Sequence, residues 1–208
     1  MKRKLCLALI LIGIVLLGAA GGLAVYNVSE DSRAGKESER VLDEVVEAIT
    51  LNAAEVTPAP AMPQPSFTEV VPEMETVVNE DSTYIGIIEI PSLGVTLPVQ
   101  ADWSYSKLKI APCRYAGSYY TDDLVICAHN YGSHFNGLRW VDMGEDVYFT
   151  TASGVTYHYV IDNRETLDPD ENDRLVDPEG DWDLTLFTCY IGGATRCVIR
   201  CQRVKNAA

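Results

Sequence analysis

The order of apolar and polar positions divides the chain into three parts, of which the first is a long apolar run. Residues 5–26 contain no charged side chain. As an α-helix this run would span about 33 Å, close to the hydrocarbon thickness of a bilayer. The apolar core of a cleaved signal peptide is usually shorter, about 7–15 residues, and no persuasive small-x-small cleavage site follows. The pattern predicts a transmembrane anchor over residues 1–26, with a cleaved signal peptide as the alternative.

The second part, residues 27–80, has the texture of a stalk. Residues 27–40 are polar and are expected to be mobile. Apolar side chains then recur at helical spacing and predict a short amphipathic helix: Val41, Leu42, Val45, Val46 and Ile49. We interpret this helix as a spacer or a weak self-association seam. Five prolines between Pro58 and Pro72 predict an extended linker that cannot pack as a core.

The third part, residues 81–208, alternates short β-rich runs with turns rich in Pro, Gly, Asp and Asn. The expected strands are 84–91, 95–99, 124–128, 146–150, 156–161, 184–189 and 196–204. So many short strands with few helical stretches predict a mainly β fold. The expected architecture is a closed β-barrel of about seven to eight strands with short helices.

The distribution of charge argues against one class of function and predicts the orientation of the chain in a membrane. Lys and Arg total 16 against 30 Asp and Glu, a net charge of −14, which argues against nucleic acid because its phosphates would be repelled. Lys2, Arg3 and Lys4 precede the apolar run, and no acidic residue occurs before Glu30. This asymmetry predicts a cytoplasmic N-terminus and a folded domain outside the cell.

Three side chains at expected strand ends suggest nucleophilic chemistry: His129, Cys189 and Arg196. A reactive thiol needs a proton-transfer partner, and a tetrahedral intermediate needs a cation or N–H donors around its oxyanion. These three groups meet both needs without a metal or cofactor. Five cysteines follow the apolar run, an odd number that leaves at least one thiol unpaired or paired with another molecule. The disulfide state of four of them stays open: Cys113, Cys127, Cys197 and Cys201.

The sequences around these groups resemble the sortase family. Residues 185–189 read Thr-Leu-Phe-Thr-Cys, similar to the TLxTC signature of sortases, and Arg196 follows seven positions after the cysteine. Residues 125–130 resemble the family's strand-end histidine motif, and residues 88–91 with 97–99 resemble its opening hairpin. The order His, Cys, Arg is also the family's. The resemblance covers most of the part after the stalk.

The resemblance implies a sortase-like barrel over residues 81–208 that acts as a cysteine transpeptidase. Cys189 would attack the threonine-like carbonyl of an LPxTG-like sorting signal on a surface protein. His129 would protonate the departing amine and deprotonate the incoming one, and Arg196 would hold the substrate and its oxyanion. Thr188 and Asn130 are expected to line the substrate site. The acceptor would be an amine of a cell-wall precursor or a lysine of another surface protein.

The chain departs from the family pattern in two respects. The spacing from Cys189 to Arg196 is short, so the loop 190–195 must be tight, and Arg200 is the fallback if Arg196 is misaligned. No Asp-Pro-aromatic lid motif precedes the domain. A class B-like or class D-like enzyme therefore fits better than a housekeeping or pilus enzyme.

The remaining polar groups have simpler interpretations. We expect His134 to be a solvated loop residue, His158 a surface or barrel-wall residue, and Cys127 a buried thiol. A calcium site is a weak alternative, because four residues fall at positions 1, 3, 5 and 12 of an EF-hand-like loop: Asp168, Asp170, Asn172 and Glu179. Asp173 replaces the usual glycine of such a loop, and a solvated acidic loop is the preferred interpretation.

Three alternative functions remain open. A structural zinc site could be built from four residues: Cys127, His129, Cys189 and Cys197. Its C-x-H spacing is unusual, and it leaves Arg196 without a role. The second alternative is a membrane-tethered binding barrel without catalysis, and the third is a hydrolytic cysteine protease.

Overall fold

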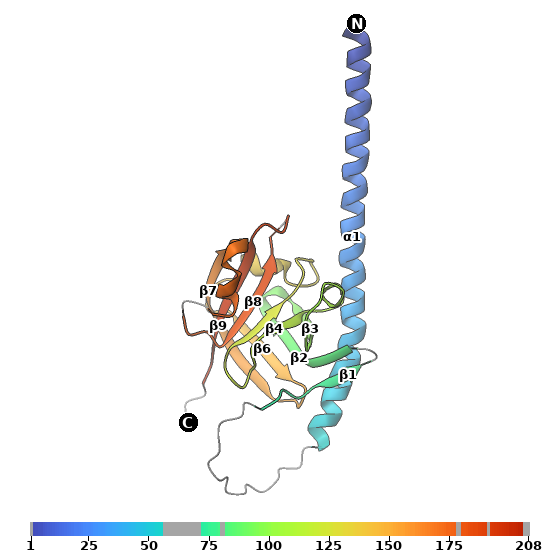
Figure 1. Ribbon diagram of the computed structural model, residues 1–208. Coiled ribbons are helices and arrows are strands. Elements are labelled where there is room, and N and C mark those ends of the chain that lie inside the picture. The colour runs from blue at the N-terminus through green and yellow to red at the C-terminus, as the bar shows by residue number, and fades with distance from the viewer. Residues whose placement is uncertain (1, 56–71, 80–81, 178–179, 191, 206–208) are drawn as a thin grey trace, which may run out of the picture.

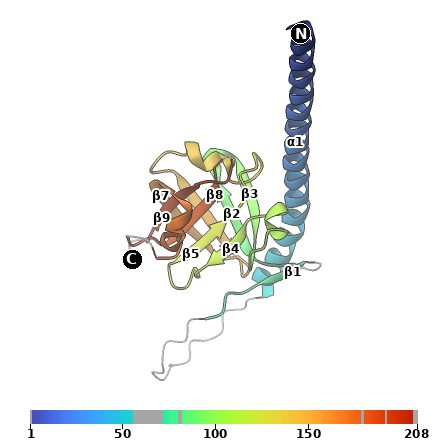
Figure 2. The ribbon, with the colours of Figure 1, turned by 45° about the horizontal axis from the view of Figure 1, so that its top comes forward.

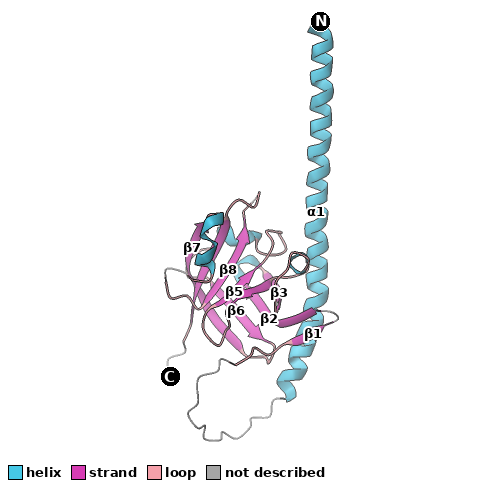
Figure 3. Cartoon of the chain, viewed as in Figure 1, coloured by secondary structure: helices cyan, strands magenta, loops and turns pink. Residues whose placement is uncertain are grey.

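The computed structural model describes residues 2–55, 72–79, 82–177, 180–190 and 192–205. A single long helix, α1 (Lys2–Glu55), precedes a compact set of strands (Figures 1 and 3). The strands are β1 (Val77–Asn79), β2 (Ser82–Ile90), β3 (Val95–Gln100), β4 (Cys113–Ala116), β5 (Leu124–Cys127), β6 (Asp146–Thr151), β7 (Thr156–Leu167), β8 (Leu184–Cys189) and β9 (Arg196–Arg203). Short 3-10 helices lie between them: η1 (Pro91–Leu93), η2 (Lys107–Lys109), η3 (Asn136–Trp140) and η4 (Pro169–Leu175).

The described strands pair in the order β1-β2-β3-β4-β5-β8-β9-β7-β6, and β2 also pairs with β6. Strands β2 to β9 therefore form a closed barrel of eight strands, with β1 on the edge beside β2. This confirms the predicted mainly β barrel, and all seven expected strands are present. The sequence pattern missed β1 and β4, because runs of three and four residues are too short to show an alternation.

Glycine permits the closure of the barrel. Gly86 of β2 lies opposite Thr151 of β6, and its φ is +154°. A Cβ atom at this position would lie 2.1 Å from the carbonyl oxygen of Thr150. Because any larger side chain would collide with that backbone, only glycine lets β2 approach β6 this closely.

The sheet is covered by apolar side chains on both faces where β5, β8 and β9 lie. The inward face belongs to the barrel core and includes Leu124, Ile126, Leu184, Leu186 and Ile199. The outward face carries a second apolar cluster, here called the outer cluster: Leu108, Cys113, Val125, Cys127, Leu167, Leu175, Phe187 and Val198. Burial on both faces explains why β5 and β8 are nearly continuous apolar runs rather than alternating ones.

Helix α1 has two parts with different surfaces. Large apolar side chains from Leu7 to Val28 are exposed, whereas a buried stripe begins at Ala34. The stripe recurs every three or four residues: Ala34, Ser38, Val41, Val45 and Ile49. It packs against the barrel at Val77, Tyr84 and Ala152. Figure 2 shows the helix beside β2 and β3, on the side away from β7 and β9.

The second part of α1 corrects the expected stalk. Residues 27–40, predicted to be polar and mobile, are helical and continuous with the segment around Val41. That segment is not a free spacer, because its apolar stripe is buried against the barrel. The prediction was wrong because the partner surface of the stripe lies in strands far along the chain. Most of the predicted proline-rich linker, residues 56–71, lies outside the described residues.

All six cysteines are free in the structure. Cys113, Cys127, Cys197 and Cys201 are buried, and Cys189 is half-buried. Burial raises the pKa of the thiols of Cys113, Cys127, Cys197 and Cys201. Such thiols stay protonated and inert, so the partly accessible Cys189 stands apart as a candidate nucleophile.

The packing of α1 on the barrel gives a first prediction. Val45→Ala removes two buried methyl groups and should lower the free energy of unfolding by about 1–2 kcal/mol. The adjacent Val46 is 44% exposed, so Val46→Ala should change it by less than about 0.5 kcal/mol. Chemical denaturation of the full chain in detergent, followed by near-ultraviolet circular dichroism, measures both. Equal effects of the two substitutions would contradict the observed packing.

Candidate active site

The parallel pairing of β5 with β8 brings the predicted histidine and cysteine to one rim of the barrel. The two strands pair from Leu124↔Leu184 to Cys127↔Phe187, a constant offset. The Thr188 hydroxyl then donates a hydrogen bond to the carbonyl oxygen of Ala128 (2.9 Å). Because parallel strands end on the same side, His129 and Cys189 follow at equivalent positions on this rim.

The antiparallel pairing of β8 with β9 adds the arginine. Cys189 and Arg196 are direct partners across the two strands. The connection is closed by a hydrogen bond from the Tyr190 N–H to the carbonyl oxygen of Thr195 (2.9 Å). Gly193 within it has a φ of +71°, a conformation that glycine adopts without strain. The short spacing therefore places Arg196 beside Cys189, and the loop between them is tight, as expected from the sequence.

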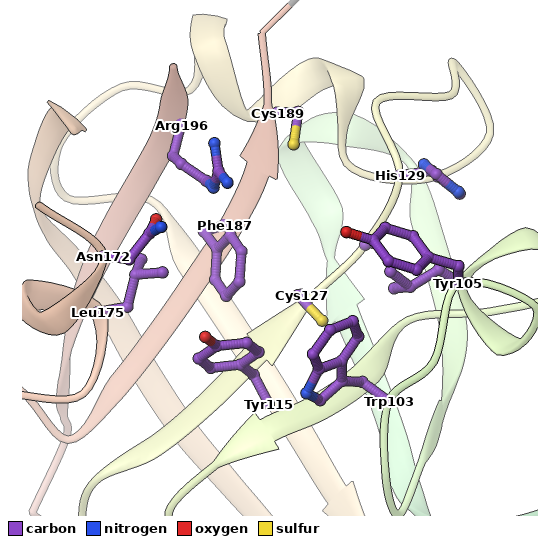
Figure 4. A pocket seen from close by; sticks show the side chains of 12 residues that line it. Trp103, Tyr105, Tyr115, Cys127, His129, Asn172, Leu175, Phe187, Cys189 and Arg196 are labelled. Atoms are coloured by element: carbon purple, nitrogen blue, oxygen red, sulfur yellow. The ribbon is translucent and has the colours of Figure 1, made fainter. Parts of the chain in front are cut away.

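A cavity of about 280 Å³ lies on the outward face of the sheet next to these residues (Figure 4). Its lining comprises Trp103, Tyr105, Leu108, Tyr115, Cys127, Ala128, His129, Asn172, Leu175, Phe187, Cys189 and Arg196. Aromatic rings make a continuous wall, with ring centroids 5.7 Å apart for Trp103 and Tyr115 and 5.2 Å apart for Tyr115 and Phe187. The cavity thus offers a largely apolar groove that leads to a few polar groups.

Arg196 presents an unpaired donor to this cavity. Its Nη1 atom is buried and has no hydrogen-bond partner among the described residues, and Figure 4 shows the guanidinium directed toward the cavity. The Oδ1 atom of Asn172, on the same wall, is buried without a partner in the same way. Buried polar atoms normally have a hydrogen-bond partner, because a buried polar atom without one lowers the stability of the fold by about 1–3 kcal/mol. Both atoms are suited to bind polar groups of a substrate.

Arg200, the alternative to Arg196 in the sequence analysis, does not lie beside Cys189. Its side chain is fully buried, and its Nε donates to the Glu165 carboxylate (2.8 Å). Its Nη1 donates to the Thr185 hydroxyl (2.8 Å), and its Nη2 donates to the carbonyl oxygen of Arg174 in η4. Arg200 therefore fastens η4, which supplies one wall of the cavity, but it does not line the cavity.

His129 is half-buried and lines the cavity from the opposite side to Arg196. Burial, with a smaller contribution from the positive charge of Lys109, lowers the pKa of its imidazole below the usual value. The imidazole is therefore neutral at neutral pH. In Figure 4 its ring points away from Cys189, and its centroid lies 4.8 Å from that of Tyr131. A rotation of the side chain would be needed for a direct contact with the thiol.

The two residues expected to contact substrate lie elsewhere. Thr188 is 2% exposed and does not line the cavity, because its hydroxyl is used in the bond to Ala128. Its position supports the rim and does not face the groove. Asn130 lies on the far side of His129, where it lines a second cleft together with part of α1.

The loop after His129 is held by α1. The Asp31 carboxylate accepts hydrogen bonds from the backbone N–H groups of Gly132 (3.0 Å) and Ser133 (3.1 Å) and from the Ser133 hydroxyl (2.8 Å). These bonds lower the pKa of Asp31 although its partial burial acts in the opposite direction. The helix that carries the apolar run thus positions a loop at the candidate site.

The same loop buries His134 completely, so the prediction of a solvated histidine was wrong. Neither ring nitrogen has a hydrogen-bond partner among the described residues. Burial lowers the pKa of His134 to about 4; the nearby His129 lowers it further, whereas Asp31 opposes the shift. His158, in contrast, is a partly exposed residue of β7 that lies 2.7 Å from Asp146, which agrees with the expected surface position.

The residues of the zinc alternative do not converge. Cys127 and Cys189 line the outer cavity, whereas the Cys197 side chain is part of the barrel core on the other face of the sheet. One metal ion cannot be reached by thiolates on opposite faces of a strand pair.

Two residues of the calcium alternative make hydrogen bonds in or beside η4. Asp168 precedes η4, and its backbone N–H donates to the Glu171 carboxylate (3.0 Å). Asn172 donates to the carbonyl oxygen of Pro169 (2.7 Å). Glu179 lies outside the described residues. Within the described ranges no group of three or more His, Cys, Asp or Glu side chains could hold a metal ion.

Several lining residues were not identified from sequence. The most prominent are Trp103 and Tyr105, in the loop between β3 and β4, and Tyr115 of β4. The only local signal is the closely spaced pair of aromatic residues 103 and 105 in a segment without strand periodicity. Aromatic side chains outside a regular element are candidates for a binding surface, and this pair could have been flagged on that ground.

The contribution of Lys109 to the electrostatics of His129 can be tested by nuclear magnetic resonance. In Lys109→Gln the loss of a nearby positive charge should raise the imidazole pKa of His129 toward its usual value. Lys107 belongs to the same short helix but pairs with Asp102 at 2.7 Å, so Lys107→Gln is the matched control and should leave that pKa unchanged. An unaltered His129 titration in Lys109→Gln would contradict the assignment.

Burial of His134 predicts an acid-sensitive stability. The unfolded chain binds a proton at His134 below about pH 6.5, whereas the folded chain binds it only near pH 4. Folding therefore loses stability as pH falls through this window, by up to about 3 kcal/mol from this group. His134→Phe keeps an aromatic ring without this penalty. Thermal unfolding between pH 7 and pH 4.5 should show a smaller loss in the variant, and an identical loss would refute the burial of a neutral imidazole.

Comparisons with known proteins identify the family of the chain. A family model described as the sortase domain matches residues 88–204, more than half of the chain, and includes His129, Cys189 and Arg196. A search of curated proteins finds no match.

Solved structures resemble the described fold. Sortase C1 from Streptococcus suis is 28% identical, with a TM-score of 0.50, over 60% of this chain and 75% of that chain. Sortase C1 from Streptococcus agalactiae is 25% identical, with a TM-score of 0.52, over 63% and 72% of the two chains. Sortase A from Corynebacterium diphtheriae, at 20% identity and a TM-score of 0.53, covers 91% and 97% and shares the fold. On the extent of the family match, this chain belongs to the sortase family.

Proposed function

We propose that the protein is a cysteine transpeptidase that cleaves an LPxTG-like sorting signal and transfers its acyl part to an amine. Membership in the sortase family implies a transpeptidase in general. The observation that supports the detailed mechanism is the meeting of His129, Cys189 and Arg196 at one end of an apolar groove. The expected class B-like or class D-like subtype stays a prediction.

In the first half of the reaction, the Cys189 sulfur attacks the carbonyl carbon of a threonine-like residue in the signal. The oxyanion that forms is stabilised by the guanidinium of Arg196, whose Nη1 has no partner among the described residues. His129 takes the proton of the Cys189 thiol and gives it to the departing amine, the C–N bond breaks, and a thioester to Cys189 remains.

In the second half, neutral His129 removes a proton from the incoming amine, which attacks the thioester carbonyl. The C–S bond then breaks and the Cys189 sulfur leaves as a thiolate, so that one amide bond replaces another. The lowered pKa of His129 favours this half, because the imidazole is already in its basic form at neutral pH.

The groove supports recognition of an apolar peptide upstream of the cleaved bond. Its wall of Trp103, Tyr115 and Phe187 rings can bury aliphatic side chains of an extended substrate. Asn172 offers an amide to the peptide backbone on the same wall. These features are consistent with the leucine and proline of an LPxTG-like signal.

The proposal also includes the location of the enzyme, with the apolar part of α1 as a membrane anchor. Helix α1 is long and apolar enough to cross a membrane, and its apolar side chains before Val28 are exposed. With basic residues before the span, we place the N-terminus in the cytoplasm and the barrel outside the cell. The partners would be surface proteins that carry a sorting signal and an amine acceptor at the cell surface.

The mechanism is tested with the full chain in detergent, a panel of LPxTG-like peptides and an amine, read by intact-mass spectrometry. An acyl adduct on Cys189 and an amine-dependent product are expected. Cys189→Ala should abolish both. His129→Ala and Arg196→Ala should each lower the rate by about 10²-fold or more.

Cys127→Ala is the matched thiol control, because Cys127 lines the same cavity but is buried and protonated. It should keep the rate within about threefold, since it removes only a small buried side chain. Full activity of Cys189→Ala would show that the mechanism is wrong. An unmodified wild-type enzyme whose Cys189 also fails to react with a thiol reagent would favour a binding barrel.

A further inference from the structure

A second cleft, of about 520 Å³, adjoins His129. One wall is the segment of α1 from Tyr26 to Asp31, and the other is formed by Asn130 and Tyr131 with Lys109 and with Gly192 of the loop that follows Cys189. His129 lines both this cleft and the groove beside Cys189. The imidazole is therefore the wall that the two cavities share.

The chemistry of transfer requires a second approach to His129. Once the thioester has formed, the acyl group fills the groove beside Cys189. The incoming amine must still reach the base within about 3 Å to lose its proton. The His129 ring already points away from Cys189 and lies beside Tyr131, a residue of the second cleft (Figure 4).

The lining of the second cleft differs from that of the first. The groove beside Cys189 is walled by aromatic rings, whereas the second cleft carries two carboxylates, Glu30 and Asp31, and the ammonium group of Lys109. Glu30 is paired with Arg33 (3.0 Å), whereas Asp31 has no Lys or Arg partner among the described residues and keeps its negative charge while it accepts hydrogen bonds from the loop after His129. The charge of Asp31 attracts a protonated amine before it reaches His129, and Lys109 can pair with an anionic group of the same molecule. Amides of Asn27 and Asn130 add neutral hydrogen-bonding groups.

The position of the cleft along α1 indicates where its ligand comes from. Its helical wall begins at Tyr26, the last residue of the predicted apolar span. The barrel lies alongside the C-terminal half of α1, while the N-terminal half projects beyond it (Figure 1). If the apolar run spans a bilayer, the cleft opens where the helix leaves the membrane. A molecule held in the outer leaflet can enter it without leaving the bilayer.

We propose that this second cleft binds the acyl acceptor, an amine-bearing headgroup of a membrane-borne molecule. The segment of α1 from Tyr26 to Asp31 is then a part of the active site as well as a tether. This inference rests on the proposed transpeptidase function and names the side from which its second substrate enters.

The test uses substitutions that fill the cleft from the helix side. Asn27→Trp and Val28→Trp place a large ring at lining positions. Ser32→Trp is the matched control, because Ser32 is exposed on the same helix and does not line the cleft. The full chain is placed in phosphatidylglycerol vesicles with a peptide that acylates Cys189. The acceptor probe is triglycine, either free in solution or linked through its C-terminus to a lipid of the vesicles.

The measured quantity is the ratio of amine-transfer product to hydrolysis product. In the wild type the lipid-linked probe should give a ratio at least about tenfold above that of free triglycine at equal bulk concentration, because the anchor raises its local concentration. Asn27→Trp and Val28→Trp should lower the ratio for the lipid-linked probe by about tenfold or more. Ser32→Trp should keep it within about twofold.

Each contrary outcome has a separate meaning. If both cleft variants kept the wild-type ratio, the second cleft would not be the acceptor site. If free and lipid-linked triglycine were used equally well, the acceptor would not need to come from the membrane, and that part of the inference would be overturned. If no acyl adduct formed in the wild type with any peptide, the proposed function itself would fail, and with it this inference.

Discussion

The in-register parallel pairing of β5 with β8 is the contact on which the candidate active site depends. It sets the rim positions of His129 and Cys189, and the bond from Thr188 to Ala128 fixes the two strand ends together. A shift of either strand by one residue would exchange its inward and outward faces. Cys189 would then point into the barrel core, away from the groove and from Arg196, and the reaction would have no nucleophile.

That register is maintained because both faces of the strands are buried. The barrel core covers one face, and the outer cluster around Phe187 covers the other. The outer cluster needs η4 as a cover, and the buried Arg200 holds η4 through Glu165 and backbone carbonyl oxygens. A costly buried charge is thus hydrogen-bonded through all three of its nitrogen atoms. It shapes the wall of a groove whose own arginine keeps a donor unpaired.

Helix α1 connects the apolar N-terminal run to this site. Its buried stripe around Val45 attaches the helix to the barrel, and Asp31 holds the loop that follows His129. The helix therefore influences the site by direct contacts and not only by confining the domain to a surface. Under the proposed function, a helix that anchors the chain and shares a cleft with His129 joins localisation and substrate access in one element.

The sequence by itself determined seven of the nine described strands, the apolar run of α1 and the three candidate side chains of the site, because each depends on local patterns or short motifs. Apolar runs bounded by turn residues specify strands, and the motif around Cys189 carries the family resemblance. Only the tertiary structure decided the burial of His134, the inward position of Thr188 and the continuity of α1 along the barrel. These depend on contacts between distant residues, such as Asp31 with Ser133, and no periodicity within a short window encodes such a contact.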